Sequence, residues 1–87
     1  MHAVFVMLKV EPGHLYRVAD AVTELEIFSE MYSIVGDYDL LLKIYVDDFE
    51  ALGDLVTQRL HTVPHIRETK TILTFRAYEL PPVKERA

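Results

Sequence analysis

The sequence predicts a single α+β domain whose elements follow the order β-α-β-β-α-β. Three observations support this prediction. Four stretches have the alternating or nearly continuous apolar pattern of strands, two stretches repeat apolar residues every three or four positions, and Pro and Gly residues mark several of the breaks. The chain has 87 residues, which is enough for one domain only. We assign residues 1–79 to this domain and residues 80–87 to a C-terminal tail.

The first half of the chain predicts a strand over residues 2–10 and a helix over residues 13–25. The even-numbered face of the strand is uniformly apolar, and the odd-numbered face is largely apolar too, which is typical of a central strand covered on both sides. Glu11-Pro12-Gly13 breaks the strand because Pro and Gly suit a turn. The helix carries one apolar stripe, formed by Leu15, Val18, Ala19, Val22 and Leu25.

The middle of the chain predicts two strands joined by a tight hairpin. Residues 27–35 form the second strand, and its polar positions favour an edge of the sheet. Gly36-Asp37-Tyr38 turns the chain, because Gly can adopt the positive φ that hairpin turns need. Residues 39–46 form the third strand, which is again apolar enough for a central position.

A second amphipathic helix is predicted over residues 48–61, with Asp47 and Glu50 at the spacing of a capping box. Gly53 within it is expected to permit close packing on the sheet. A long fourth strand follows over residues 66–78. The remaining segment, with Pro81-Pro82 and a charged end, is expected to be frayed.

Right-handed crossovers predict that the first and third strands lie side by side in the centre, parallel to each other, with the second and fourth strands outside. This order of elements is that of the ferredoxin-like fold, a four-stranded antiparallel sheet with both helices on one face. We expect the helices to cover the face formed by Val4, Val6, Leu8, Val10, Leu40, Leu42, Ile44 and Val46.

The opposite face of the predicted sheet is also apolar and has no helix to cover it. A monomer would expose a large apolar patch there, which is unusual for a small domain. We therefore expect two sheets to pack face to face in a homodimer, the arrangement called a dimeric α+β barrel. The predicted interface residues are Ala3, Phe5, Met7, Leu41 and Tyr45.

The hairpin turn is the part of the sequence that points to a ligand. From spacing alone, a bare structural turn is the simpler interpretation. A second interpretation is recognition of a small zwitterion, in which backbone N–H groups of Asp37 and Tyr38 receive a carboxylate. Asp37 or Asp39 would then pair with an ammonium group, and Tyr38 would close over the side chain. Thr69 and Thr71 share a face of the fourth strand, and their hydroxyls can line a polar pocket.

Composition excludes several other functions. The net charge of −5 argues against direct binding of nucleic acid and leaves no polybasic patch for a membrane. The chain has no cysteine, no signal-peptide pattern and no apolar run of membrane-spanning length, so we expect a cytoplasmic protein. No catalytic constellation or cofactor motif is present.

No metal site is predicted either. Among His2, His14, His61 and His65, only His61 and His65 have helical i, i+4 spacing, and Pro64 separates them.

Three segments together resemble the effector-binding RAM domain (regulation of amino acid metabolism) of Lrp/AsnC transcriptional regulators. They occur in the family's order and spacing over about residues 2–78, and the central block is the most specific. The segments are Lys9-Val10-Glu11-Pro12-Gly13-His14, Ile34-Val35-Gly36-Asp37-Tyr38-Asp39-Leu40-Leu41-Leu42-Lys43-Ile44 and Val63-Pro64-His65-Ile66-Arg67-Glu68-Thr69-Lys70-Thr71.

The resemblance implies a ferredoxin-like fold, a sheet-to-sheet dimer and assembly of dimers into an octamer or similar ring. It also implies binding of small effectors, chiefly amino acids, at contacts between dimers, without catalysis. Carried over to this chain, the ligand-binding residues are Val35, Gly36, Asp37, Tyr38 and Asp39, together with Thr69 and Thr71.

The sequence departs from the family pattern in two places. Full-length members carry an N-terminal helix-turn-helix domain, whereas residue 1 here almost begins the first strand. We therefore expect a stand-alone RAM protein that does not itself bind DNA and that has full-length regulators as candidate partners. Where the family often has Gly before the fourth strand, this chain has His65, so the resemblance does not determine the shape of that loop.

Two alternative functions share the predicted topology. A small dimeric α+β barrel enzyme, such as a monooxygenase, would keep a cavity between the sheet and the helices, whereas the predicted helix-facing residues here are aliphatic. An ACT-like amino-acid-binding module would centre its site on the first strand–helix loop, Glu11-Pro12-Gly13-His14.

Overall fold

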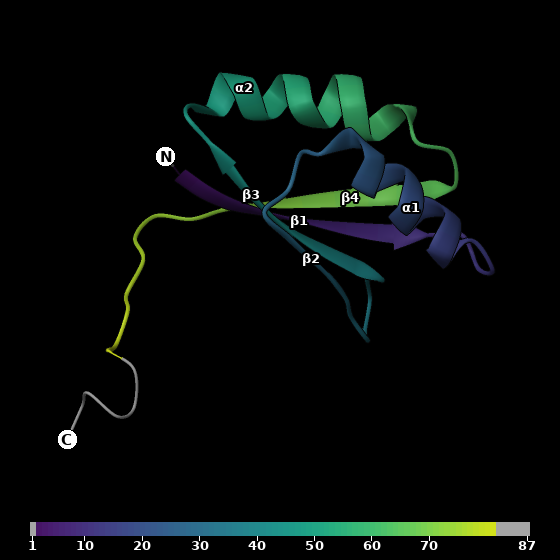
Figure 1. Cartoon of the computed structure of the whole chain (residues 1–87), viewed down its shortest axis with the longest axis horizontal. Coiled ribbons are helices and arrows are strands. Elements are labelled where there is room, and N and C mark those ends of the chain that lie inside the picture. Colours follow the sequence, from purple (N-terminus) through teal and green to yellow (C-terminus); the bar gives the residue numbers. More distant parts are fainter. Residues whose placement is uncertain (1, 82–87) are drawn as a thin grey trace.

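The computed structural model describes residues 2–81, and its elements follow the predicted order (Figure 1). The first half contains β1 (His2–Val10), α1 (Leu15–Leu25), β2 (Glu30–Ser33) and β3 (Leu40–Val46). The second half contains α2 (Phe49–Asp54), a π-helical turn (Leu55–Arg59), a 3-10 turn (Leu60–Thr62) and β4 (Ile66–Leu73). Most of the predicted tail, residues 82–87, lies outside the described residues.

The four strands form one sheet in the order β2-β3-β1-β4, and every neighbouring pair is antiparallel. The central position of β1 and β3 is confirmed, but the expectation that they run parallel is wrong. Helix α1 carries the chain from β1 past the position of β3 to β2, which makes β1 and β2 the parallel strands of the crossover. The hairpin then reverses the chain, so β3 runs opposite to β1.

Both helices pack on the same face of the sheet (Figure 1). All eight positions predicted to face them are buried: Val4, Val6, Leu8, Val10, Leu40, Leu42, Ile44 and Val46. Val18 and Val22 of α1 and Leu52 of α2 close the core from above. Among the side chains that the structure describes, which are those of residues 2–56 and 58–81, no polar or charged residue is buried, so the layer between sheet and helices is mainly aliphatic. None of the helices in this range is long and apolar enough to cross a membrane.

The two edge strands are shorter than predicted. Strand β2 begins only at Glu30, because Ile27 and Phe28 pack against the core instead of extending the ladder. Strand β4 ends at Leu73, and the hydroxyl of Thr74 donates a hydrogen bond to the carbonyl of Ala3 as the chain leaves the sheet.

In the second helical segment the structure differs from two further predictions. Its N-cap is Asp48, whose Oδ1 accepts a hydrogen bond from the amide of Ala51 at 2.7 Å, so the predicted capping box at Asp47 and Glu50 is wrong. A Cβ atom at Gly53 would meet nothing within 4 Å. Gly53 is exposed to solvent, so it does not serve close packing on the sheet.

Candidate functional site

The connection between β2 and β3 is a six-residue loop over residues 34–39, longer than a tight two-residue hairpin. The amide of Ile34 donates to the carbonyl of Asp39 at 3.0 Å and closes the loop. Gly36 has φ 140°, a conformation that L-residues rarely adopt. The requirement for Gly at this position is therefore confirmed.

Asp39 fixes this loop to the neighbouring strand β1 through two hydrogen bonds. Its amide donates to the carbonyl of Leu8 at 2.9 Å, and its Oδ2 accepts from the amide of Val10 at 2.8 Å. The second bond satisfies a partly buried backbone donor at the point where β1 ends. Asp39 thus determines the position of the loop, and part of its carboxylate is already engaged.

The remaining loop residues present their side chains outward. Val35 is fully exposed, Asp37 is exposed and Tyr38 is half-buried. Lys9 Nζ donates to the backbone carbonyl of Asp37 at 3.0 Å, and this bond does not use the Asp37 carboxylate. This short loop therefore exposes an aliphatic side chain and a carboxylate and carries a half-buried phenol.

Thr69 and Thr71 share a face of β4, as predicted, and this face is the one that the helices cover. Thr69 pairs with Leu8 and Thr71 pairs with Val6, both of which are buried beneath the helices. Since Leu8 also pairs with Leu40, Thr69 lies two strands away from the start of β3, or about 10 Å. In a single chain the threonines and the loop do not form one pocket.

Thr71 instead lines a groove of about 410 Å³ between β4 and the second helix. The other lining residues are Phe49, Leu52, Gly53, Val56 and Leu73.

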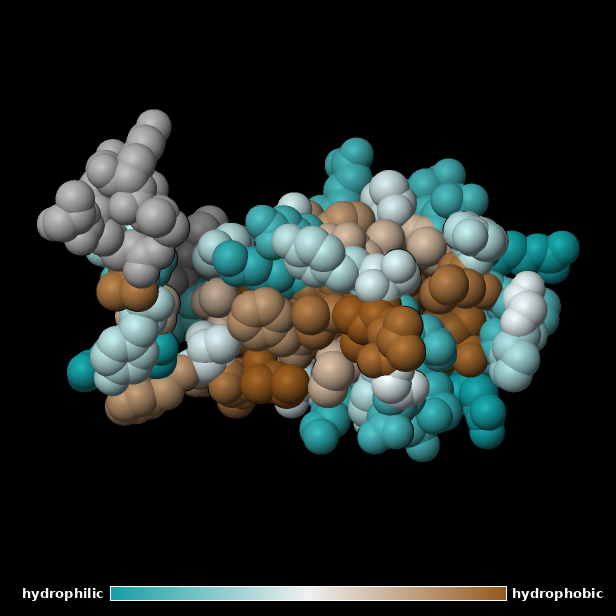
Figure 2. All heavy atoms as spheres, turned by 90° about the horizontal axis from the view of Figure 1, so that it is seen from below, coloured by the Kyte–Doolittle hydropathy of each residue, from teal (hydrophilic) through white to brown (hydrophobic). Residues whose placement is uncertain are grey.

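The face of the sheet opposite the helices carries all five residues of the predicted dimer interface. Figure 2, viewed from the side opposite α2, shows hydrophobic atoms gathered across the middle of the molecule with hydrophilic atoms around them. Strand pairing adds Tyr32, beside Leu41, and Ile72, beside Phe5, to this surface. Tyr32 is 50% and Ile72 41% exposed. We call this surface the open face; its apolar residues are Ala3, Phe5, Met7, Tyr32, Leu41, Tyr45 and Ile72.

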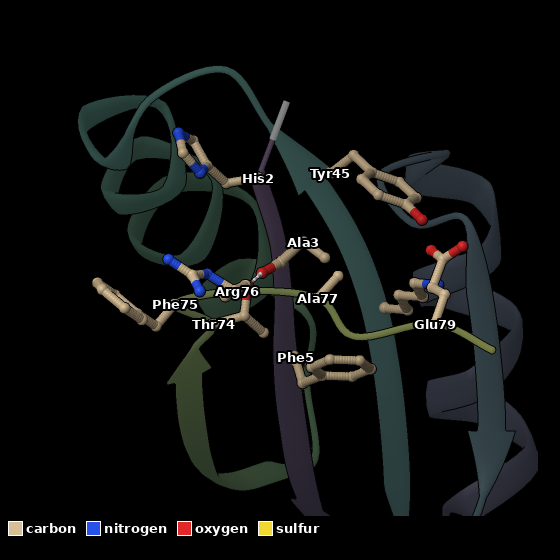
Figure 3. Close-up of a pocket in the computed structure, with 10 residues that line it drawn as sticks. His2, Ala3, Phe5, Tyr45, Thr74, Phe75, Arg76, Ala77 and Glu79 are labelled. Atoms are coloured by element: carbon tan, nitrogen blue, oxygen red, sulfur yellow. Dashed lines mark hydrogen bonds between the residues drawn. The ribbon is translucent and has the colours of Figure 1, made fainter.

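The segment that follows β4 crosses one end of the open face (Figure 3). It encloses a pocket of about 470 Å³ together with residues of β1 and β3, including Phe5, Lys43 and Tyr45. Phe75 and Tyr78 of this segment are almost fully exposed. The pocket is therefore part of the surface that a second sheet would cover.

A cluster of three side chains lies at the end of β1, where the sequence predicted no metal site. Glu11 and His14 come from the β1–α1 loop, and His65 comes from the loop before β4. The rings of His14 and His65 stack with centroids 3.7 Å apart and planes 10° apart. His65 Nδ1 lies 2.9 Å from Glu11 Oε2, and this hydrogen bond lowers the pKa of Glu11.

His65 occupies a left-handed backbone conformation, with φ 72°. This conformation costs a non-glycine residue about 1 kcal/mol, and histidine is among the residues that tolerate it best. The loop thus keeps the left-handed shape that suits Gly at a position where the chain carries an imidazole. Sequence spacing compared His65 only with His61 and missed this cluster, and the one available signal was the histidine in place of a family glycine.

The comparisons with known proteins agree with this architecture. The model of the Lrp/AsnC ligand binding domain matches residues 3–82. The HTH-type transcriptional regulator FL11 of Pyrococcus abyssi is 27% identical over 75 residues, which cover 86% of this chain and 49% of FL11. The chain therefore spans about half the length of the curated relatives it matches.

Two solved structures show the same fold. TTHA0845 from Thermus thermophilus is 34% identical, with a TM-score of 0.84 over 92% of this chain and 100% of that protein. The transcriptional regulator NMB0573 of Neisseria meningitidis, solved as an L-Met complex, is 14% identical, with a TM-score of 0.80 over 91% of this chain and 53% of the regulator. The match to the domain model and the likeness to TTHA0845 together show that the chain belongs to the family of Lrp/AsnC ligand-binding domains.

Proposed function

We propose that this protein is an oligomeric sensor module that binds an amino acid at the loop of residues 35–39 and modulates transcription or amino acid metabolism without binding DNA itself. The observation that carries the proposal is the loop itself. Asp39 and Gly36 fix its backbone, while Val35 and Asp37 are exposed and Tyr38 is half-buried. An amino acid offers a carboxylate, an ammonium group and a side chain, and the loop offers a complement to each.

The chemistry of recognition follows from these residues. Backbone N–H groups of Asp37 and Tyr38 would receive the effector carboxylate, and the Asp37 carboxylate would pair with the ammonium group. Tyr38 would pack on the effector side chain. The description of NMB0573 as an L-Met complex supports an amino acid as the ligand class.

The loop in one chain is a surface and not an enclosed pocket, so a neighbouring copy is needed to complete the site. Val35 is fully exposed and lies next to the proposed ligand position. Burying this side chain against another chain is favourable and would exclude water from the ion pair. Thr69 and Thr71 belong to this proposal only as residues that a neighbouring copy supplies.

Dimer formation through the open face is the first step of the proposed assembly. Charges of both signs lie on this face. Lys43 lies within its centre, beside Phe5 and next to Glu30 of β2, and Glu68 and Lys70 lie on the edge strand β4. Two copies related by a two-fold axis present the same patch to each other, and mixed charges allow pairing across such an interface. Dimers would then assemble into an octamer or similar ring, with full-length Lrp/AsnC regulators as candidate partners.

Binding without catalysis is the function that the interior supports. A dimeric α+β barrel enzyme would place polar side chains between the sheet and the helices, and the described side chains that are buried there (residues 2–56 and 58–81) are all hydrophobic. The acidic net charge of −5 supports regulation through protein partners and not through DNA.

The test is a screen of the twenty amino acids by thermal shift, followed by calorimetry of those that raise Tm. We expect at least one to bind the wild-type protein. Asp37→Ala should weaken its binding by about tenfold to a hundredfold, because a charged hydrogen bond contributes about 1.5–3 kcal/mol.

Asp20→Ala is the matched control, since Asp20 is exposed on α1 and away from the loop. Equal losses in the two variants would assign the effect to net charge and refute the role of Asp37. No binding of any amino acid would remove the sensor function.

A further inference from the structure

We propose that Glu11, His14 and His65 bind a divalent transition-metal ion such as Zn²⁺. The site is independent of the effector position at residues 35–39, and its test does not require an effector. Each of the three residues offers one donor atom, and the three donors lie within 4.8 Å of one another. Two imidazole nitrogens and a carboxylate oxygen are a donor set that Zn²⁺ takes at open sites, where the fourth position holds water or a small ligand.

The backbone holds the three donors together before any ion binds. The amide of Glu11 donates to the carbonyl of His65 at 2.9 Å and joins the two loops. The amide of His14 donates to the carbonyl of Glu11 at 3.1 Å and closes the turn that places both residues on the same side. Little loop ordering is therefore left for the ion to induce.

The hydrogen bonding of the two imidazoles leaves nitrogen lone pairs for an ion. Nδ1 of His14 is buried and has no hydrogen-bond partner within the described chain. An unpaired buried polar atom is costly, and a bound ion removes that cost. His65 directs Nδ1 to the Glu11 carboxylate, so Nε2 carries the lone pair when the ring is neutral.

Binding requires one movement of the rings. Imidazole lone pairs lie in the ring plane, so two stacked rings 10° from parallel do not point at a common ion. Donors on a tetrahedral Zn²⁺ ion are about 3.4 Å apart, closer than the 4.8 Å limit observed here. His65 is 36% exposed in its side chain and has room to rotate toward His14.

The backbone conformation at His65 allows a test variant that removes the metal ligand without straining the loop. Gly adopts φ 72° without strain, so His65→Gly removes the imidazole and relaxes the loop at the same time. We expect this variant to have a Tm equal to or above that of the wild type when no metal is present. Loss of metal binding in it then reports the missing ligand and not a damaged fold.

The experiment measures Zn²⁺ binding by calorimetry and by the rise in Tm, on untagged protein, with Mg²⁺ as the control ion. We expect about one Zn²⁺ per chain for the wild type and no effect of Mg²⁺, which prefers oxygen ligands. His65→Gly and His14→Ala should each bind Zn²⁺ about tenfold or more weakly. His61→Ala, which removes an exposed histidine outside the cluster, should bind as the wild type does.

Two results would overturn the proposal. One is a wild-type protein whose Tm and calorimetric trace do not respond to Zn²⁺. The other is Zn²⁺ binding that survives unchanged in both His65→Gly and His14→Ala, or that falls equally in His61→Ala. Neither result bears on amino-acid binding at residues 35–39, so failure of this proposal and failure of the proposed function are distinguishable.

Discussion

Replacing Leu41 by Glu is expected to separate the protein into single chains at concentrations where the wild type is a dimer. Leu41 lies on the open face between Met7 and Tyr32. Burial of a leucine side chain contributes about 1.5 kcal/mol or more, and a two-fold interface contains the substituted residue twice, once from each chain. A loss of about 3 kcal/mol raises the dimer dissociation constant about a hundredfold, and burying unpaired carboxylates adds to this. Sedimentation or light scattering measures the mass.

The double variant Phe5→Glu with Leu41→Glu extends the same test to the neighbouring position on β1. Both side chains point away from the aliphatic core, so circular dichroism should show the wild-type secondary structure. Tyr16→Glu is the control, because Tyr16 is 84% exposed on α1 and remote from the open face. An unchanged mass for the double variant would exclude the open face as the dimer interface.

Replacing Asp39 by Ala is expected to lower the free energy of unfolding by about 1.5–3 kcal/mol and to abolish effector binding. The carboxylate accepts the amide of Val10 where β1 ends, and removing it leaves a partly buried donor without a partner. The loop of residues 34–39 would also lose one of its three hydrogen bonds to β1. Urea unfolding gives the change in stability, and calorimetry gives the change in binding.

Asp37→Ala is the matched comparison for stability. Lys9 bonds the backbone carbonyl of Asp37, and this bond survives the substitution. We therefore expect Asp37→Ala to change the unfolding free energy by less than about 0.5 kcal/mol while still lowering the affinity for the effector. An Asp39→Ala variant as stable as Asp37→Ala would contradict the role assigned to Asp39.

Most of the fold was predictable because the central strands are apolar on alternate positions. All eight residues predicted to face the helices are buried, since a period of two determines which side chains share a face. The direction of β3 relative to β1 was wrong because the crossover passes over β3 before the hairpin reverses the chain. The predicted ends of β2 and β4 were wrong because a short edge strand ends where its pairing ends and not where the apolar pattern in the sequence ends.

The candidate sites were predictable only where the signal is local. Gly36 and the loop around it are contiguous in sequence, so turn chemistry identified them. The position of Thr71 depends on its register with Val6, which no local pattern encodes. The Glu11, His14 and His65 cluster joins the first loop to the last, and stacking of its rings follows from tertiary structure alone.

The central claim is that the loop of residues 35–39 is half of a binding site and that assembly supplies the other half. The most direct test is calorimetric titration of the amino acid found in the screen into the wild type and into the Phe5→Glu, Leu41→Glu double variant. We predict saturable binding to a wild-type assembly of at least twice the 10.1 kDa of one chain. The separated chains should bind at least about tenfold more weakly, although their loop is intact. Equal affinity of separated chains and assembly, or no binding to the wild type, would contradict the claim.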